Sequence, residues 1–209
     1  HEIRWAGLQL REEGGRKGFI MCQLLYLIFF FFLFISLSFG QQFNPETDDI
    51  NAAVKSYFQN RTSAELKYGP IGTWNTTGII NMDNLFSCEQ PTWSPSIQSA
   101  CKQFNEDISA WDVSSVESMI ELFNDASVYN QPLPWHTPAL IRMDKIFKNT
   151  NAFNQDLSTW SIGKVTKISN AFNNAISFNQ SLNQWNVSSC KEFQYMFYGA
   201  IIFNGAISN

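Results

Sequence analysis

Histidine, cysteine and carboxylate side chains are the groups with which this 209-residue chain could hold a metal or attack a substrate. Its only histidines are His1 and His136, whereas a zinc site needs several convergent ligands. A serine nucleophile would need His136 as its base, and no G-x-S-x-G motif accompanies it. Glu106-Asp107 and Asp144 are isolated acidic positions, and no phosphate-binding glycine loop is present. We therefore predict no catalytic residue, no metal and no cofactor, which means that the chain is not an enzyme, and we expect His136 to be a surface side chain.

The cysteines suggest an oxidising compartment rather than a metal site. Cys88 and Cys101 flank a proline-containing insertion, and a local disulfide between them is plausible in an exported protein. Cys22 lies in an apolar segment near the start of the chain. Cys190 falls where other repeats carry Val or Ile, so we interpret it as a small buried hydrophobe.

Four N-x-[ST] motifs are candidates for N-glycosylation if the host is eukaryotic. Asn and Ser/Thr are common in this chain, so some of these motifs arise by chance. They carry no catalytic meaning, and they predict exposed turns. The four asparagines are Asn60, Asn75, Asn179 and Asn186.

An apolar run, Leu24–Phe39, precedes the rest of the chain and follows Met21. Basic residues lie before this run and small residues close it at Ser38 and Gly40, which is the order of a secretory signal peptide. We predict a signal over residues 21–40, with an uncleaved membrane anchor as the alternative. Residues 1–20 would then be an untranslated leader or a cloning artefact. Both alternatives send the following residues across the membrane, to a secreted or cell-surface location.

The charge of the remaining chain argues against a nucleic-acid partner. From Gln41 onward there are 10 Lys and Arg residues against 15 Asp and Glu residues. A protein that binds duplex DNA usually shows a basic face, and the sequence reveals none. Phe, Trp and Ile recur throughout, so the chain is expected to fold rather than to be disordered.

Aromatic residues recur with one period. From Trp111 onward the tryptophans are 24 or 25 residues apart, and Phe-Asn or Tyr-Asn pairs recur at the same spacing between them. A further phenylalanine column lies twelve residues after each tryptophan. Such self-similarity indicates a repeat protein in which stacked units bury one another. The predicted repeat core contains Trp74, Trp111, Trp135, Trp160 and Trp185, with Phe86, Phe123, Phe147, Phe172 and Phe197.

The pattern within one repeat predicts a strand followed by a helix. Leu157-x-x-Trp160-x-Ile162 resembles the strand of a leucine-rich repeat. A helical stripe follows the strand in each unit, and Ser114-x-x-Glu117 has the form of a capping box. We therefore predict an α/β repeat: a right-handed, leucine-rich-repeat-like solenoid whose coils each pair a short strand with a short helix. The stripe is Val116, Met119, Leu122 and Phe123.

The organisation expected after the signal is a cap followed by repeats. Residues 41–70 are predicted to form a helical N-terminal cap, with an acidic start at Asp48-Asp49 that suits the helix dipole. Residues 71–209 are the repeats, with an insertion at 88–103 and a truncated last repeat. No C-terminal cap is visible, so we expect the chain to continue or its open end to associate.

Two segments carry a family resemblance: Phe153-Asn-Gln-Asp-Leu-Ser-Thr-Trp160 and Trp111-Asp-Val-Ser-Ser-Val-Glu-Ser-Met119. They resemble the repeat of BspA-like leucine-rich-repeat surface proteins, over about residues 48–209. The resemblance implies a right-handed solenoid displayed at cell surfaces, in a family associated with adhesion and with host or matrix interaction. Repeat 129–152 departs from the pattern by its three prolines and by its length.

Binding is the function that the repeats favour. The residues that follow the tryptophans vary from coil to coil, and stacking would align them into a polar stripe on a rigid surface. We predict an extracellular protein or carbohydrate ligand. The alternatives are a structural component of the cell envelope, or the N-terminal array of a longer secreted enzyme or receptor. The stripe contains Asp112, His136, Ser161 and Asn186.

Overall fold

The computed structural model describes residues 42–206. The predicted leader (1–20) and the predicted signal segment (21–40) lie outside the described residues. Within residues 42–206, no helix is long and apolar enough to cross a membrane.

Two helices cover the first coil. Helix α2 (Ile50–Gln59) begins after Asp49, whose carboxylate accepts hydrogen bonds from the backbone N–H groups of the first turn. Helix α3 (Arg61–Tyr68) is capped by Asn60 and ends at Gly69, where a φ of 75° favours glycine. A 3-10 turn, Ile71–Thr73, then leads into the first coil. The buried face of α2 is Ile50, Ala53, Val54, Tyr57 and Phe58.

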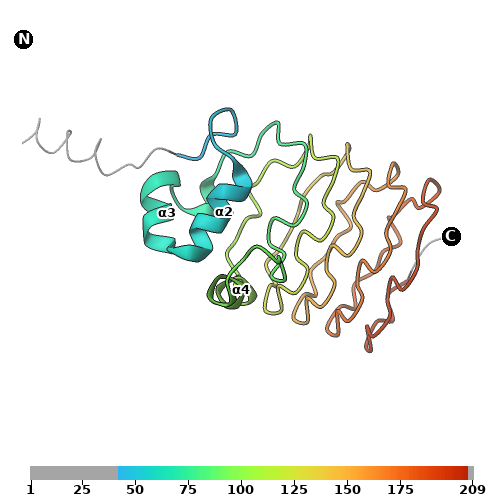
Figure 1. The fold of residues 1–209 in the computed structure, drawn as a ribbon. Helices are drawn as coiled ribbons and strands as arrows, with labels where there is room; N and C mark the ends of the chain where they lie inside the picture. Colours follow the sequence, from blue (N-terminus) through green and yellow to red (C-terminus); the bar gives the residue numbers. More distant parts are fainter. Residues whose placement is uncertain (1–41, 207–209) are drawn as a thin grey trace, which may run out of the picture. The chain divides into compact units, whose positions relative to one another are not determined.

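Five coils follow the cap and stack one behind another, from green to red in Figure 1. Each begins at a tryptophan, and equivalent residues of neighbouring coils lie side by side. The first coil carries the insertion, which contains α4 (Pro95–Lys102). The coils are residues 74–110, 111–134, 135–159, 160–184 and 185–206.

The predicted α/β repeat is wrong. Within residues 42–206 the only α-helices are α2, α3 and α4, which belong to the cap and the insertion. Outside the insertion, the coils in residues 74–206 contain no helix and no strand, and neighbouring coils are joined by single-residue parallel bridges. These bridges run along the stack through Asn81, Ser118, Arg142, Lys167 and Glu192.

The reason lies in where the backbone N–H groups of the expected helix point. Those of Met119, Glu121 and Phe123 donate to carbonyl oxygens of the next coil at 2.8 to 2.9 Å, so they cannot close an α-helix. The residues between them form tight turns instead, such as Leu122 N–H to Met119 O. Glu121 and Asp125 have positive φ values of 55° and 63°, which a helix does not allow. Turns of three residues bury the same positions as a helical stripe would.

The predicted strand at Leu157–Ile162 does not form either. The backbone N–H of Trp160 donates to Leu157 O at 3.1 Å, which closes a turn across the segment that was expected to be extended. The expected capping box does not form either, because the N–H of Glu117 donates to Ile80 O of the preceding coil.

Stacked aromatic rings fill the interior. The five tryptophans are at most 3% exposed, and Phe86, Phe123, Phe147 and Phe172 are fully buried. Neighbouring rings in this phenylalanine column, which continues to the partly buried Phe197, have centroids 5.4 to 5.6 Å apart. The Phe/Tyr-Asn column packs beside it, with centroids 4.0 to 4.5 Å away. Each buried ring removes a large apolar area from water.

From Trp111 onward, each indole N–H donates to a backbone oxygen two or three residues before the tryptophan of the preceding coil. Trp160 Nε1 donates to Leu133 O at 2.9 Å, and Trp185 Nε1 donates to Leu157 O at 3.1 Å. Trp111 and Trp135 make equivalent bonds to Ile71 O and Ile108 O, whereas Trp74 donates to Gly69 O at the end of the cap. A tryptophan therefore both fills the core and fixes the register between coils.

Asparagines form a second set of contacts between coils. In the Phe/Tyr-Asn column, each asparagine side-chain oxygen accepts the backbone N–H of the next asparagine, at 2.7 to 2.9 Å. A separate series begins at Asp125, where Asn149 Nδ2 donates to Asp125 Oδ1 and Asn174 Nδ2 donates to Asn149 Oδ1. These bonds satisfy polar groups at the edges of the aromatic core.

We expect Trp160→Phe to lower the free energy of unfolding by about 1–3 kcal/mol, because Leu133 O would lose its buried donor. Trp160→Ala should cost about 3–5 kcal/mol, because it also removes the ring from the stack. Urea denaturation measures both values. Trp93→Phe is the matched control, since the Trp93 indole N–H has no protein acceptor within residues 42–206, and it should cost less than Trp160→Phe. Equal costs would contradict the register role of the indole N–H.

Tyr129→Phe should leave the unfolding free energy unchanged or raise it by about 1 kcal/mol. The Tyr129 hydroxyl is fully buried and has no hydrogen-bond partner within the described residues, so its removal relieves a desolvation cost. The reverse change, Phe153→Tyr in the next coil, should destabilise by about 1–3 kcal/mol. Thermal and urea unfolding of the two variants test the pair, and a destabilised Tyr129→Phe protein would contradict it.

Candidate functional site

The residues that follow the tryptophans form a polar stripe along the stack. Asn75, His136 and Asn186 are exposed, and Asp112 and Ser161 are partly exposed. Three of these side chains also shape their own turns. Asn75, Asp112 and Asn186 each accept the backbone N–H of the residue two positions later, at 3.0 to 3.1 Å. The turn geometry therefore recurs while the side chain changes from coil to coil.

His136 and Ser161 contact each other across two coils, with 3.2 Å between His136 Nδ1 and Ser161 Oγ. Local sequence motifs do not predict this pair, although the separation of 25 residues equals the repeat period. Asp112 occupies the same position in the preceding coil, but hydrogen bonds from Ser114 and Thr77 engage its carboxylate and lower its pKa. The three side chains therefore do not form a Ser-His-Asp relay, which requires the acid to orient the histidine.

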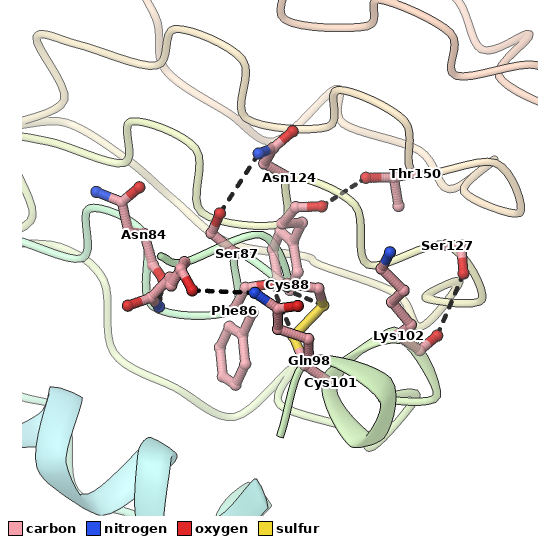
Figure 2. Close-up of a disulfide and its surroundings, with 12 residues drawn as sticks. Asn84, Phe86, Ser87, Cys88, Gln98, Cys101, Lys102, Asn124, Ser127 and Thr150 are labelled. Carbon is pink, nitrogen blue, oxygen red and sulfur yellow. Dashed lines mark hydrogen bonds between the residues drawn. A yellow bond between two sulfur atoms is a disulfide. The ribbon is translucent and has the colours of Figure 1, made fainter. Parts of the chain in front are cut away.

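The two cysteines of the insertion, Cys88 and Cys101, are joined by a disulfide, with their Cα atoms 5.3 Å apart. Figure 2 shows the bond between α4 and the end of the Phe86–Cys88 segment. Both sulfur atoms are buried and lie within 3.5 Å of Phe86 O. The bond holds the insertion against the aromatic core, where Trp93 packs on Phe58 with centroids 5.6 Å apart. Cys190 is free and partly buried.

The four sequon asparagines occupy different environments. Asn60 caps α3, and Asn75 and Asn186 lie in exposed turns. Asn179 belongs to the asparagine ladder, where its side-chain oxygen accepts the N–H of Asn204 at 2.7 Å. A glycan on Asn179 would lie at a contact between coils, so Asn75 and Asn186 are the positions with the most room. Glycosylation of all four stays a prediction.

Two carboxylates are partly withdrawn from solvent. Burial raises the pKa of Asp125, and the nearby Glu89 adds to this effect. Asp125 Oδ2 is buried without a hydrogen-bond partner within the described residues. Burial also raises the pKa of Asp144, while Lys167 and Arg142 oppose the change. Within residues 42–206, no three His, Cys, Asp or Glu side chains are grouped so as to hold a metal ion.

A small hollow lies between the cap and the end of the insertion, lined by Tyr57, Arg61 and Glu106 among others. The Arg61 guanidinium pairs with Glu65 at 2.7 Å and also with Glu106, and it lies 5.4 Å from the Tyr57 ring centroid. Burial raises the pKa of Tyr57, and the Glu106 charge adds to the effect. Because its charges are already paired with one another, we interpret this cluster as a structural contact that holds the cap against the end of the insertion, rather than as a ligand site.

The comparison with known families gives one match. A family model described as "Mycoplasma protein of unknown function, DUF285" matches residues 52–134 and 95–209. The chain belongs to this family. The first DUF285 match begins inside α2, and the second overlaps it and continues to the end of the stack. The cap and the five coils therefore lie in one family region. No curated protein and no solved structure matches the chain.

The description of DUF285 assigns no function, so it identifies neither a reaction nor a ligand. The DUF285 match agrees with a repeat family of the kind that the sequence resembles, but it does not establish the finer BspA-like leucine-rich-repeat motif. The coil geometry rules out that motif's strand-and-helix unit in residues 42–206.

Asp125→Asn should raise the unfolding free energy at neutral pH, and the gain should shrink as the pH falls. The folded-state pKa of Asp125 is raised, so its ionised form destabilises the fold above that pKa, and protonation removes the penalty at lower pH. Asparagine keeps the oxygen that Asn149 contacts and tolerates the positive φ. Urea denaturation at pH 7 and pH 4 measures the difference.

Asp107→Asn provides the control of opposite sign. Hydrogen bonds from Ser109 lower the pKa of Asp107, so its ionised form stabilises the fold above the unfolded-state pKa, and this contribution is lost at low pH. The Asp107→Asn protein should therefore be less stable than the parent at neutral pH and converge with it in acid. The same pH trend in both variants would contradict the assigned environments.

Proposed function

We propose that the chain is a secreted or cell-surface recognition protein that binds an extracellular protein or carbohydrate and catalyses no reaction itself. The observation that carries the proposal is the polar stripe. Its side chains are Asn, Asp, His, Ser and Asn in the five successive coils, although each follows a buried tryptophan in the same backbone position. A rigid stack can thus change its surface chemistry without changing its core.

Two further features support the exported location. The Cys88–Cys101 disulfide is a bond that persists in oxidising compartments and is rare in the cytosol. The sequence resemblance to BspA-like surface proteins, which are associated with adhesion, points the same way. The aligned Ser161 and His136 side chains offer hydrogen-bonding groups for a ligand, and Asp112 continues the stripe on the second coil.

The test uses the full chain on a glycan array and on immobilised extracellular-matrix proteins. We expect His136→Ala combined with Ser161→Ala to weaken binding to the recognised probe about fivefold or more, as for the loss of about 1 kcal/mol of polar contacts. Thr92→Ala combined with Ser99→Ala is the matched control, because both residues are exposed on the insertion and lie off the stripe. Equal binding by both variants would overturn the stripe as the recognition surface.

A further inference from the structure

The charges of the described chain are divided between its two halves. Residues 42–130 contain 4 Lys and Arg against 12 Asp and Glu, whereas residues 131–206 contain 6 against 3. The cap and the first two coils are therefore acidic, and the last three coils are basic. The mild net charge of −4 for the whole sequence conceals this division.

Five of the six Lys and Arg residues of the last three coils lie between one residue before a parallel bridge and six residues after it, and Lys164 precedes this segment. The parallel bridges place Arg142 beside Lys167, and the backbone N–H of Lys191 donates to Thr166 O, one residue before Lys167. Lys145 and Lys148 follow Arg142 in the same coil by three and six residues. The basic patch is Arg142, Lys145, Lys148, Lys167 and Lys191.

Several of these charges have no ion-pair partner. Lys145 Nζ lies 2.7 Å from Glu121 Oε1, and Lys167 Nζ lies 3.3 Å from Glu192 Oε2. Within residues 42–206, Arg142, Lys148 and Lys191 form no ion pair. Arg142 and Lys191 are also exposed, so their charges face solvent.

The second coil carries the opposite charge at positions equivalent to those of the patch. The residue before the bridge is Glu117 in the second coil and Lys191 in the fifth. The residue three positions after the bridge is Glu121 in the second coil and Lys145 in the third. A polyanion that follows the side of the stack would be attracted by the last three coils and repelled by the first two.

We propose that the basic patch binds an acidic polysaccharide, through its sulfate or carboxylate groups. A rigid stack presents cations on consecutive coils, and a linear polymer with regularly spaced anionic groups can contact several of them at once. Multiple contacts of this kind release counterions and give binding that depends strongly on salt. The proposal rests on the exported location proposed above, where such polymers occur, and concerns a different surface from the polar stripe.

The test measures heparin and dextran sulfate binding by the full chain from 50 to 500 mM NaCl. We expect a linear fall of log Kobs with log salt. The variant Arg142→Gln, Lys148→Gln, Lys191→Gln should lose about tenfold or more in affinity at 50 mM NaCl and should lower the salt slope by about two, by analogy with the slope of roughly 0.7–0.9 per nucleic-acid phosphate contact. These three residues make no ion pair in the described structure, so the fold should be retained, and thermal unfolding verifies this.

The matched control is Lys55→Gln, Lys67→Gln, Lys102→Gln, which changes the net charge equally but lies in the acidic half. It should bind both polymers like the parent chain. An equal loss in the two triple variants would show an effect of net charge alone and overturn the patch. Absence of binding to both polymers at 50 mM NaCl would also overturn it, as would tighter binding to duplex DNA. If the basic patch fails this test while the polar stripe still binds its probe, only the present proposal is overturned, and the proposed function stands.

Discussion

In every coil but the last described one, the backbone N–H groups of four alternate residues after the tryptophan donate to carbonyl oxygens of the coil that follows. The other features of the stack depend on this ladder. Because those N–H groups point along the stack, the residues between them close into tight turns. In each coil after the first, two of these equivalent positions adopt positive φ, such as Lys145 and Asn149. The same ladder holds neighbouring coils in register, so that aromatic rings, indole N–H groups and asparagine side chains each meet their equivalents. A regular helix in the coil would have removed all these contacts at once.

The repeat columns could be read from the sequence, but the backbone conformation could not. The spacing of Trp111, Trp135, Trp160 and Trp185 is enough to locate the buried tryptophans, and helical spacing from Ile50 to Phe58 corresponds to the buried face of α2. Within a coil, however, turns of three residues and an α-helix bury nearly the same positions, so the stripe at Val116 and Met119 was ambiguous. The direction of the N–H groups decides between them, and it depends on a neighbouring coil that local sequence does not describe. Local apolar spacing and the capping pattern therefore favoured a strand-and-helix repeat unit, which is wrong.

Surface contacts between coils can be predicted from the sequence only by comparing residues that are one repeat period apart. His136 and Ser161 are 25 residues apart and therefore occupy equivalent positions, which a motif defined by local spacing does not reveal. The charge division was hidden in a similar way, because a total for the whole chain averages an acidic half with a basic one. The disulfide between Cys88 and Cys101 could be predicted from the sequence, because the two cysteines flank a short insertion and the bond closes it locally. Periodicity is thus informative about the outside of a stack as well as about its core.

Each coil interacts almost entirely with the coil before it and the coil after it. The Trp160 indole N–H donates to Leu133 O, two residues before the tryptophan that begins the preceding coil, and the Asn130, Asn154 and Asn179 oxygens each accept an N–H of the following coil. Gene duplication or loss of one whole unit would therefore join surfaces that are already complementary, and no compensating change in the core would be required. The 24-residue second coil between its neighbours shows that the register even tolerates a missing residue. Such a chain can evolve in length by recombination while its surface residues diversify independently.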